Sequence, residues 1–147
     1  MVYDQSVRLP GCDWTEEHTA QGFARRESAV NFNTPLEFGY ADVSVSHAGY
    51  QPQQEYQRAI AVPFRVTSGK VLVDGPEETT VERIVTLPAG HYRLIAAQCV
   101  TGDDEEVIDL YFEPLARALE QSAILVAYDA LDPPTPLIET AKVAGEA

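Results

Sequence analysis

The chain has 147 residues, of which 45% are hydrophobic and 22% are charged, with 23 acidic residues against 10 basic ones. This length suits a single domain with an adequate core, and the composition excludes a chain that is disordered throughout. The formal net charge of −13 disfavours binding to nucleic acid or to an anionic membrane, and it favours encounter with a basic partner. The alternative interpretation is that the acidity serves solubility alone.

The compartment is indicated by what the sequence lacks. The first residues contain neither a basic segment nor an apolar run, so a signal peptide is not expected. No apolar run approaches the roughly 20 residues that a membrane span needs. Cys12 and Cys99 lie far apart and have no metal-ligand spacing, so they are expected to be reduced structural thiols. A cytoplasmic bacterial protein is the simplest interpretation.

The first predicted element is a short helix near the N-terminus. Asp13 is expected to cap its first amides, and Glu16, three residues later, would complete a capping box. Arg25 and Arg26 suit the carboxyl end of this helix. Trp14 is interpreted as a core anchor beside the cap, with a partner contact as the alternative.

Beyond this helix, apolar and polar residues alternate with period 2, which is typical of half-buried strands. The predicted strands span residues 29–32, 38–46, 60–66, 71–73, 81–87, 91–100, 106–113 and 124–128. Pro63 cannot donate a ladder hydrogen bond, which argues for an edge strand or a bulge at that point. A second helical turn is expected over residues 115–120. Short strands separated by turn signals predict an all-β fold, an antiparallel β-sandwich of about eight strands with one or two short helices.

The domain boundary is expected near residue 131. Residues 1–131 would form the single sandwich domain. Pro133, Pro134 and Pro136 break regular structure, so residues 132–147 are expected to form a proline-rich, mobile C-terminal tail, with docking of Leu137 and Ile138 as the alternative.

Acidic residues gather in two turn regions, where side chains are free to reach a partner. The candidate partner-binding residues are Glu77, Glu78 and Glu82 in one region, Asp103, Asp104, Glu105 and Glu106 in the other, and the aromatic residue Tyr111. Tyr50 and Tyr56 are further candidate aromatic anchors. Each acidic run also has a plainer interpretation as a solvated loop, and residues 103–106 have a third as a calcium site, although they lack an EF-hand pattern.

Catalytic and cofactor-binding patterns are missing from the sequence. A catalytic interpretation would pair Cys12 with His18 or His91, but nothing around Cys12 matches a nucleophile motif. His18, His47 and His91 have no metal-ligand spacing, and no glycine-rich phosphate loop is present. We therefore expect no enzyme activity, no cofactor and no metal.

Four blocks, in order along the chain, carry a resemblance to a known family. They are Asp13-Trp14-Thr15-Glu16-Glu17 followed by Gly22-Phe23-Ala24, then Ala29-Val30-Asn31-Phe32, then residues 61–67 (AVPFRVT), then residues 87–94 (LPAGHYRL). In these blocks the chain resembles the ComJ family, the competence-protein-J inhibitors of a DNA-entry nuclease.

The resemblance implies inhibition of a nuclease by direct binding, without chemistry on a substrate. The family's partner is the DNA-entry nuclease NucA, and no catalytic residue exists to carry over. A nuclease must present positive charge to hold DNA, so clustered carboxylates can occupy its phosphate track. Residues 115–121 and the proline-rich tail lie beyond the resemblance, which leaves open a different nuclease or a toxin that meets its immunity protein. A sandwich that binds a small molecule or a sugar is the alternative from another class.

Overall fold

The computed structural model describes residues 1–33, 40–46, 49–73, 83–102, 105–127 and 131–144. The predicted positions Glu77, Glu78, Glu82, Asp103 and Asp104 lie outside these ranges, as does His47. Regular elements of the described residues follow in chain order: β1 (Val2–Asp4), α1 (Glu16–Gln21), β2 (Phe23–Arg26), β3 (Ala29–Phe32), β4 (Tyr40–Ser46), β5 (Arg58–Val66), β6 (Lys70–Val73), β7 (Arg83–Thr86), β8 (Gly90–Val100), β9 (Glu105–Leu115) and β10 (Ala123–Val126).

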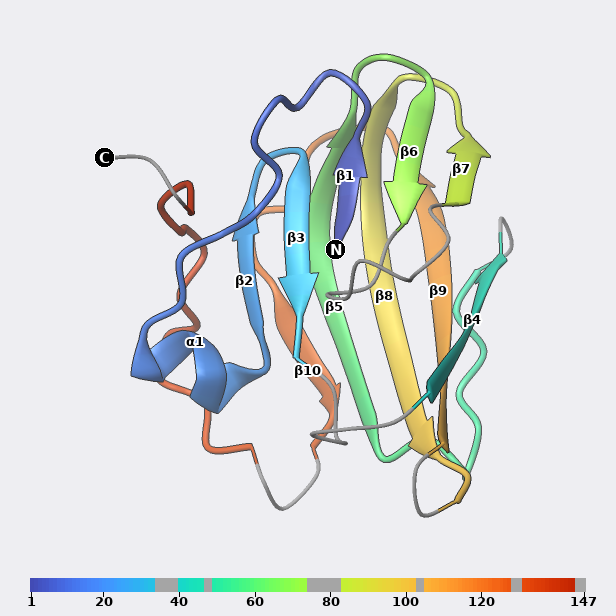
Figure 1. The fold of residues 1–147 in the computed structure, drawn as a ribbon, viewed down its shortest axis with the longest axis vertical. Coiled ribbons are helices and arrows are strands. Elements are labelled where there is room, and N and C mark those ends of the chain that lie inside the picture. Colours follow the sequence, from blue (N-terminus) through green and yellow to red (C-terminus); the bar gives the residue numbers. More distant parts are fainter. Residues whose placement is uncertain (34–39, 47–48, 74–82, 103–104, 128–130, 145–147) are drawn as a thin grey trace.

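These strands form two five-stranded sheets that pack face to face (Figure 1). Sheet I has the order β2-β3-β1-β6-β7, and sheet II has the order β10-β5-β8-β9-β4. The predicted all-β sandwich is confirmed, and the predicted strand over residues 91–100 is β8, which lies in the middle of sheet II. One strand pair departs from the prediction, because β4 runs parallel to β9. The described residues also contain two strands that the sequence did not indicate, β1 and β2.

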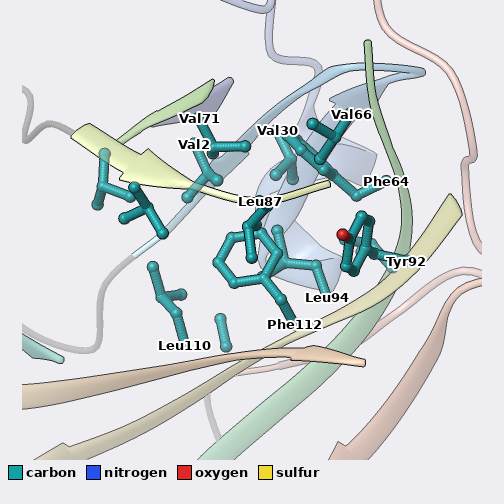
Figure 2. Close-up of a cluster of buried hydrophobic side chains, with 14 of the residues drawn as sticks. Val2, Val30, Phe64, Val66, Val71, Leu87, Tyr92, Leu94, Leu110 and Phe112 are labelled. Atoms are coloured by element: carbon teal, nitrogen blue, oxygen red, sulfur yellow. The ribbon is translucent and has the colours of Figure 1, made fainter. Parts of the chain in front are cut away.

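The core lies between the sheets and follows the predicted alternation. On β5, Ile60, Val62 and Phe64 are at most 2% exposed and point inward. Figure 2 shows Leu94 and Phe112 of sheet II directed toward the valines of sheet I. Burying an aliphatic or aromatic side chain of this size contributes on the order of 2 kcal/mol. The core therefore fixes which face of sheet II is turned outward.

The N-terminal helix begins and ends at other residues than predicted. Its N-cap is Thr15 instead of Asp13, and the capping box is completed by His18 at the third position of the helix instead of Glu16. Gly22 ends the helix in the left-handed conformation at φ 90, a backbone geometry that glycine adopts without strain. Arg25 and Arg26 consequently belong to β2, where Phe23 can enter the core.

The predicted second helix is absent from the described residues. Residues 105–115 continue as β9 because they pair with β8 as far as His91 opposite Leu115. A bend at residues 116–117 and irregular backbone follow. The predicted edge strand is not found, because β5 lies between β10 and β8, but Pro63 occupies a stretch of β5 that has a strand partner on one side only. β10 pairs with β5 at residues 59–61, so Pro63 lies beyond it, and the nearby Arg65 N–H bonds to Glu27 O instead of a strand.

Residues 131–144 lie against α1 and the segment before it. The side-chain amide of Gln21 donates to Ile138 O at 2.9 Å and accepts from Ile138 N–H at 2.8 Å. His18 Nε2 lies 2.9 Å from Thr140 O, and Cys12 forms an isolated antiparallel bridge with Val143. The sequence allowed the docking of Ile138 as an alternative but did not indicate the contacts of Thr140 and Val143, and the mobility of this segment stays a prediction.

Candidate functional site: the outer face of sheet II

Two of the predicted acidic residues lie on β9. Glu105 is exposed at the first position of the strand, where a partner can reach it. Glu106 is 5% exposed, so its side chain offers little surface to a partner. The two neighbours therefore differ as candidates, because successive residues of a strand point to opposite faces.

The three predicted aromatic anchors come together on the outer face of sheet II. Tyr111 lies on β9, and Tyr50 and Tyr56 lie on the segment that leads into β5. The ring of Tyr50 stacks with Tyr56 at 6.3 Å between centroids and meets Tyr111 edge-on at 5.4 Å. Tyr56 and Tyr111 are only 6% and 7% exposed. They therefore pack into this face and do not project from it as anchors for a partner.

Asp109 joins these tyrosines to the edge strand. Its Oδ1 accepts from Ser44 Oγ of β4, and its Oδ2 accepts from Tyr56 OH at 2.6 Å. The Tyr56 and Tyr111 hydroxyls are also 2.6 Å apart. Burial, followed by the hydrogen bonds to Asp109 and Tyr111, raises the pKa of Tyr56 far above its ordinary value. The Tyr56 hydroxyl therefore remains a proton donor throughout the physiological pH range.

Glu113, four residues after Asp109 on the same face of β9, also holds the segment before β5. Its Oε2 accepts from Tyr50 N–H at 2.8 Å, and its Oε1 accepts from the Arg93 guanidinium at 2.8 Å. Burial acts to raise the pKa of Glu113, but these hydrogen bonds and the charge of Arg93 outweigh it and lower the pKa. The segment before β5 is thus held onto β9 through both its rings and its backbone.

An open depression lies beside this network, between β4 and the segment that follows it. Its volume is about 250 Å³, and it is lined by Ser44, Ser46, Gly49, Gln51, Asp109 and Tyr111. In Figure 1, β4 is the edge strand beside β9, on the side of the molecule away from α1. The described part of the lining is polar, and within it Asp109 is the one charged residue. Such a surface suits a cationic or donor-rich ligand.

Catalytic and metal-binding arrangements are not found among the described residues. His18 is engaged by Thr15 and by Thr140 O, and Cys12 is buried and free. No group of three or more His, Cys, Asp or Glu side chains within the described ranges is placed to hold a metal ion. α1, the one helix in the described part of the chain, has six residues and is too short to span a membrane.

Trp14 is not the core anchor that the sequence predicts. Its side chain is 36% exposed and meets the edge of the His18 ring at 6.3 Å between centroids. Because the cap is at Thr15, Trp14 lies before the helix on the surface instead of stapling its first turn.

The hydrogen bonds and ring contacts described above join Ser44, Tyr50, Tyr56, Asp109, Tyr111 and Glu113 into one outer-face network. Sequence reasoning missed three of its members: Ser44, Asp109 and Glu113. The alternation on residues 106–113 did place Asp109, Tyr111 and Glu113 on one face. Their partners come from β4, β8 and the segment before β5, which are distant in sequence. The sequence therefore indicated that these three side chains share one face of a strand, but it did not indicate which residues that face contacts.

Comparison with known proteins identifies the family. The sequence model described as Competence protein J (ComJ) matches residues 1–120. Among solved structures, the chain is similar to the crystal structure of ComJ, inhibitor of the DNA degrading activity of NucA, from Bacillus subtilis, with a TM-score of 0.62 and 22% identity, covering 76% of this chain and 85% of that chain. That likeness shows a shared fold, and no curated protein matches the chain. Because the family model spans well over half of its residues, this chain belongs to the competence protein J (ComJ) family.

Proposed function

We propose that this protein inhibits a DNA-degrading nuclease by binding to it directly, without catalysing a reaction of its own. The observation that carries the proposal is membership of the ComJ family over residues 1–120. The similar structure from Bacillus subtilis is described as an inhibitor of the DNA degrading activity of NucA. The partner of this chain would be a nuclease of the same kind, and a cytoplasmic location is part of the same proposal.

The physical basis of inhibition is competition between carboxylates and DNA for a basic cleft. A net charge of −13 attracts a nuclease whose DNA-binding groove must be positive. The acidic candidates Asp103, Asp104 and Glu105, at and before the start of β9, and Glu77, Glu78 and Glu82 would cover that groove. Inhibition then combines neutralised charge with steric exclusion of the DNA strand.

The test is to mix the purified protein with a purified DNA-degrading nuclease of the NucA kind and to follow the degradation of DNA. We expect cleavage to stop near a stoichiometric ratio and a complex to elute on gel filtration. Unchanged cleavage at excess inhibitor, with both proteins eluting separately, would refute the proposal. Rescue of cells that express a delivered nuclease toxin would instead assign the chain to toxin immunity.

Reversing Asp103 and Asp104 to lysine tests the acidic surface itself. If these side chains face the cleft, the association rate constant with the nuclease should fall by about tenfold or more. Charges at the edge of an interface mainly affect the rate at which the two proteins meet. The double reversal of Glu16 and Glu17 to lysine, at exposed positions of α1, is the control and changes the net charge by the same amount. Equal effects of the two reversals would mean that net charge, and not this region, drives association.

A further inference from the structure

The depression between β4 and Gly49 presents hydrogen-bond acceptors. Tyr56 has one hydroxyl proton, which it gives to Asp109, so the 2.6 Å contact with Tyr111 requires Tyr111 to be the donor. The Tyr111 oxygen is then left as an acceptor. The Ser44 hydroxyl likewise donates its hydrogen bond to Asp109, so the lone pairs of its oxygen can still accept one. Ser44 and Tyr111, which line the depression, therefore keep oxygen lone pairs that can accept from a ligand, whereas the Tyr56 oxygen already accepts from Tyr111.

The carboxylate at the centre of this network keeps capacity for further donors. An ionised carboxylate has about four acceptor positions, and Asp109 uses two of them for Ser44 and Tyr56. Among the described residues that line the depression there is no lysine or arginine to pair with Asp109. Asp42, exposed on the same face of β4 two residues before Ser44, adds to the negative field.

The acceptors are also held in place before any ligand arrives. Asp109 is fixed from both sides, and Tyr111 is packed against Tyr50 and Tyr56. Tyr50 is itself tied to Glu113 through its backbone N–H. A preorganised acceptor set costs little entropy when a donor binds, which is the property of an interaction hot spot.

From this geometry we propose that the depression receives an arginine side chain of a basic protein partner. A guanidinium offers five N–H donors in one plane and no acceptor, which matches a site that presents acceptors around one carboxylate. Phosphate is excluded because it would bring further acceptors and negative charge. The identity of the partner rests on the proposed function, in which it is a basic nuclease, so the depression would anchor that nuclease beside the acidic start of β9.

The inference can be tested without the nuclease. Acetyl-arginine amide is titrated into the isotopically labelled protein, with amide chemical shifts followed by NMR at constant ionic strength. We expect saturable, millimolar binding with shifts centred on Ser44, Gly49 and Asp109, and weaker binding of acetyl-lysine amide. Shifts scattered over the surface, or equal binding of both compounds, would overturn arginine as the occupant.

Two variants and a control sharpen this titration. Asp109→Asn removes the charge while the Ser44 and Tyr56 hydroxyls can still bond to the amide, and arginine binding should weaken about tenfold or more. Ser44→Lys, at an edge-strand position that is exposed, would place an ammonium beside Asp109 and should abolish binding even if Asp109→Asn proves unstable. Glu17→Gln removes one charge on α1, on the far side in Figure 1, and should change nothing. Undiminished binding by Ser44→Lys would refute the site.

The same variants separate this inference from the proposed function. Against the nuclease, Asp109→Asn should raise the concentration needed for half inhibition by about tenfold to a hundredfold, as for a hot-spot residue. If wild-type and both variants inhibit equally, inhibition stands and the arginine anchor is wrong. If the wild-type binds acetyl-arginine amide but leaves DNA cleavage unchanged, the depression stands and the nuclease is the wrong partner.

Discussion

Asp4 is the most heavily bonded carboxylate among the described residues. Its side chain is fully buried and accepts backbone N–H groups of Ser6, Thr67 and Ser68 at 2.9 to 3.0 Å. Asp4→Asn would turn two amide protons toward these donors, leaving buried groups unsatisfied. We expect a loss of about 2 to 4 kcal/mol in the free energy of unfolding, measured by urea denaturation. Asp42→Asn, at an exposed position, should change it by less than about 0.5 kcal/mol.

The pH dependence of stability follows from the same carboxylate. Burial acts to raise the pKa of Asp4, but the hydrogen bonds from Ser6, Ser68 and Thr67 outweigh it and place the pKa well below its ordinary value of 3.8. A lowered folded-state pKa contributes stability that is complete above about pH 4 and is lost as the pH falls further. The urea midpoint of the wild-type should therefore drop more between pH 6 and pH 3 than that of Asp4→Asn. Parallel curves for the two proteins would contradict this assignment.

The link between Tyr56 and Asp109 makes a separate prediction at the residue scale. Tyr56→Phe deletes the hydroxyl that bonds to both Asp109 and Tyr111, which should cost about 1 to 2 kcal/mol of unfolding free energy. In a double-mutant cycle with Asp109→Asn, the two losses should be non-additive by at least about 0.5 kcal/mol. Additive losses would mean that the hydroxyl and carboxylate are not coupled in solution.

At the scale of elements, α1 and the C-terminal segment stabilise each other through Gln21. This fully buried amide bonds to both backbone groups of Ile138 in the way that a strand partner would. Gln21→Ala should release the Ile138 N–H and raise hydrogen exchange across residues 131–144, with a cost of about 1 to 3 kcal/mol. Glu17→Ala, on the exposed side of the same helix, is the control. If this segment already exchanges at the unstructured rate in the wild-type, it is the mobile tail that its prolines predict.

Local patterns predicted the strands well and the helix poorly, for physical reasons. The alternation in β5 marks the residues that face the core between the sheets, which a sequence shows directly, although Ala59 and Ala61 on the other face are buried as well. The helix depends on which of several capping residues is used, and Thr15 with His18 competes successfully with Asp13 and Glu16. Its early end at Gly22 lets Phe23 join the core. That gain is a tertiary effect, which overrides local propensity.

At the scale of the whole molecule, the outer-face network joins residues far apart in the chain. Tyr56 and Asp109 are 53 positions apart, and Ser44 and Asp109 are 65 apart. The sequence indicated Tyr111 and the acidic start of β9 as candidates, but it carried no signal that β4 runs parallel to β9. Only that pairing brings Ser44 beside Asp109. The candidate site was thus predictable as a face and not as an arrangement of atoms.

The net charge of the whole molecule should determine how the association rate depends on salt. If surplus carboxylates steer this protein to a basic nuclease, the association rate constant should fall by about tenfold or more as salt rises from roughly 0.05 to 0.5 M, because screening shortens the reach of the field. The dissociation rate should change far less, since it depends on desolvated contacts. Surface plasmon resonance at several salt concentrations measures both constants. If residues 103 and 104 contribute to this attraction, the Asp103→Asn/Asp104→Asn variant should show an association rate constant that depends less steeply on salt. An association rate constant that does not change with salt would mean that the net charge of −13 serves solubility alone.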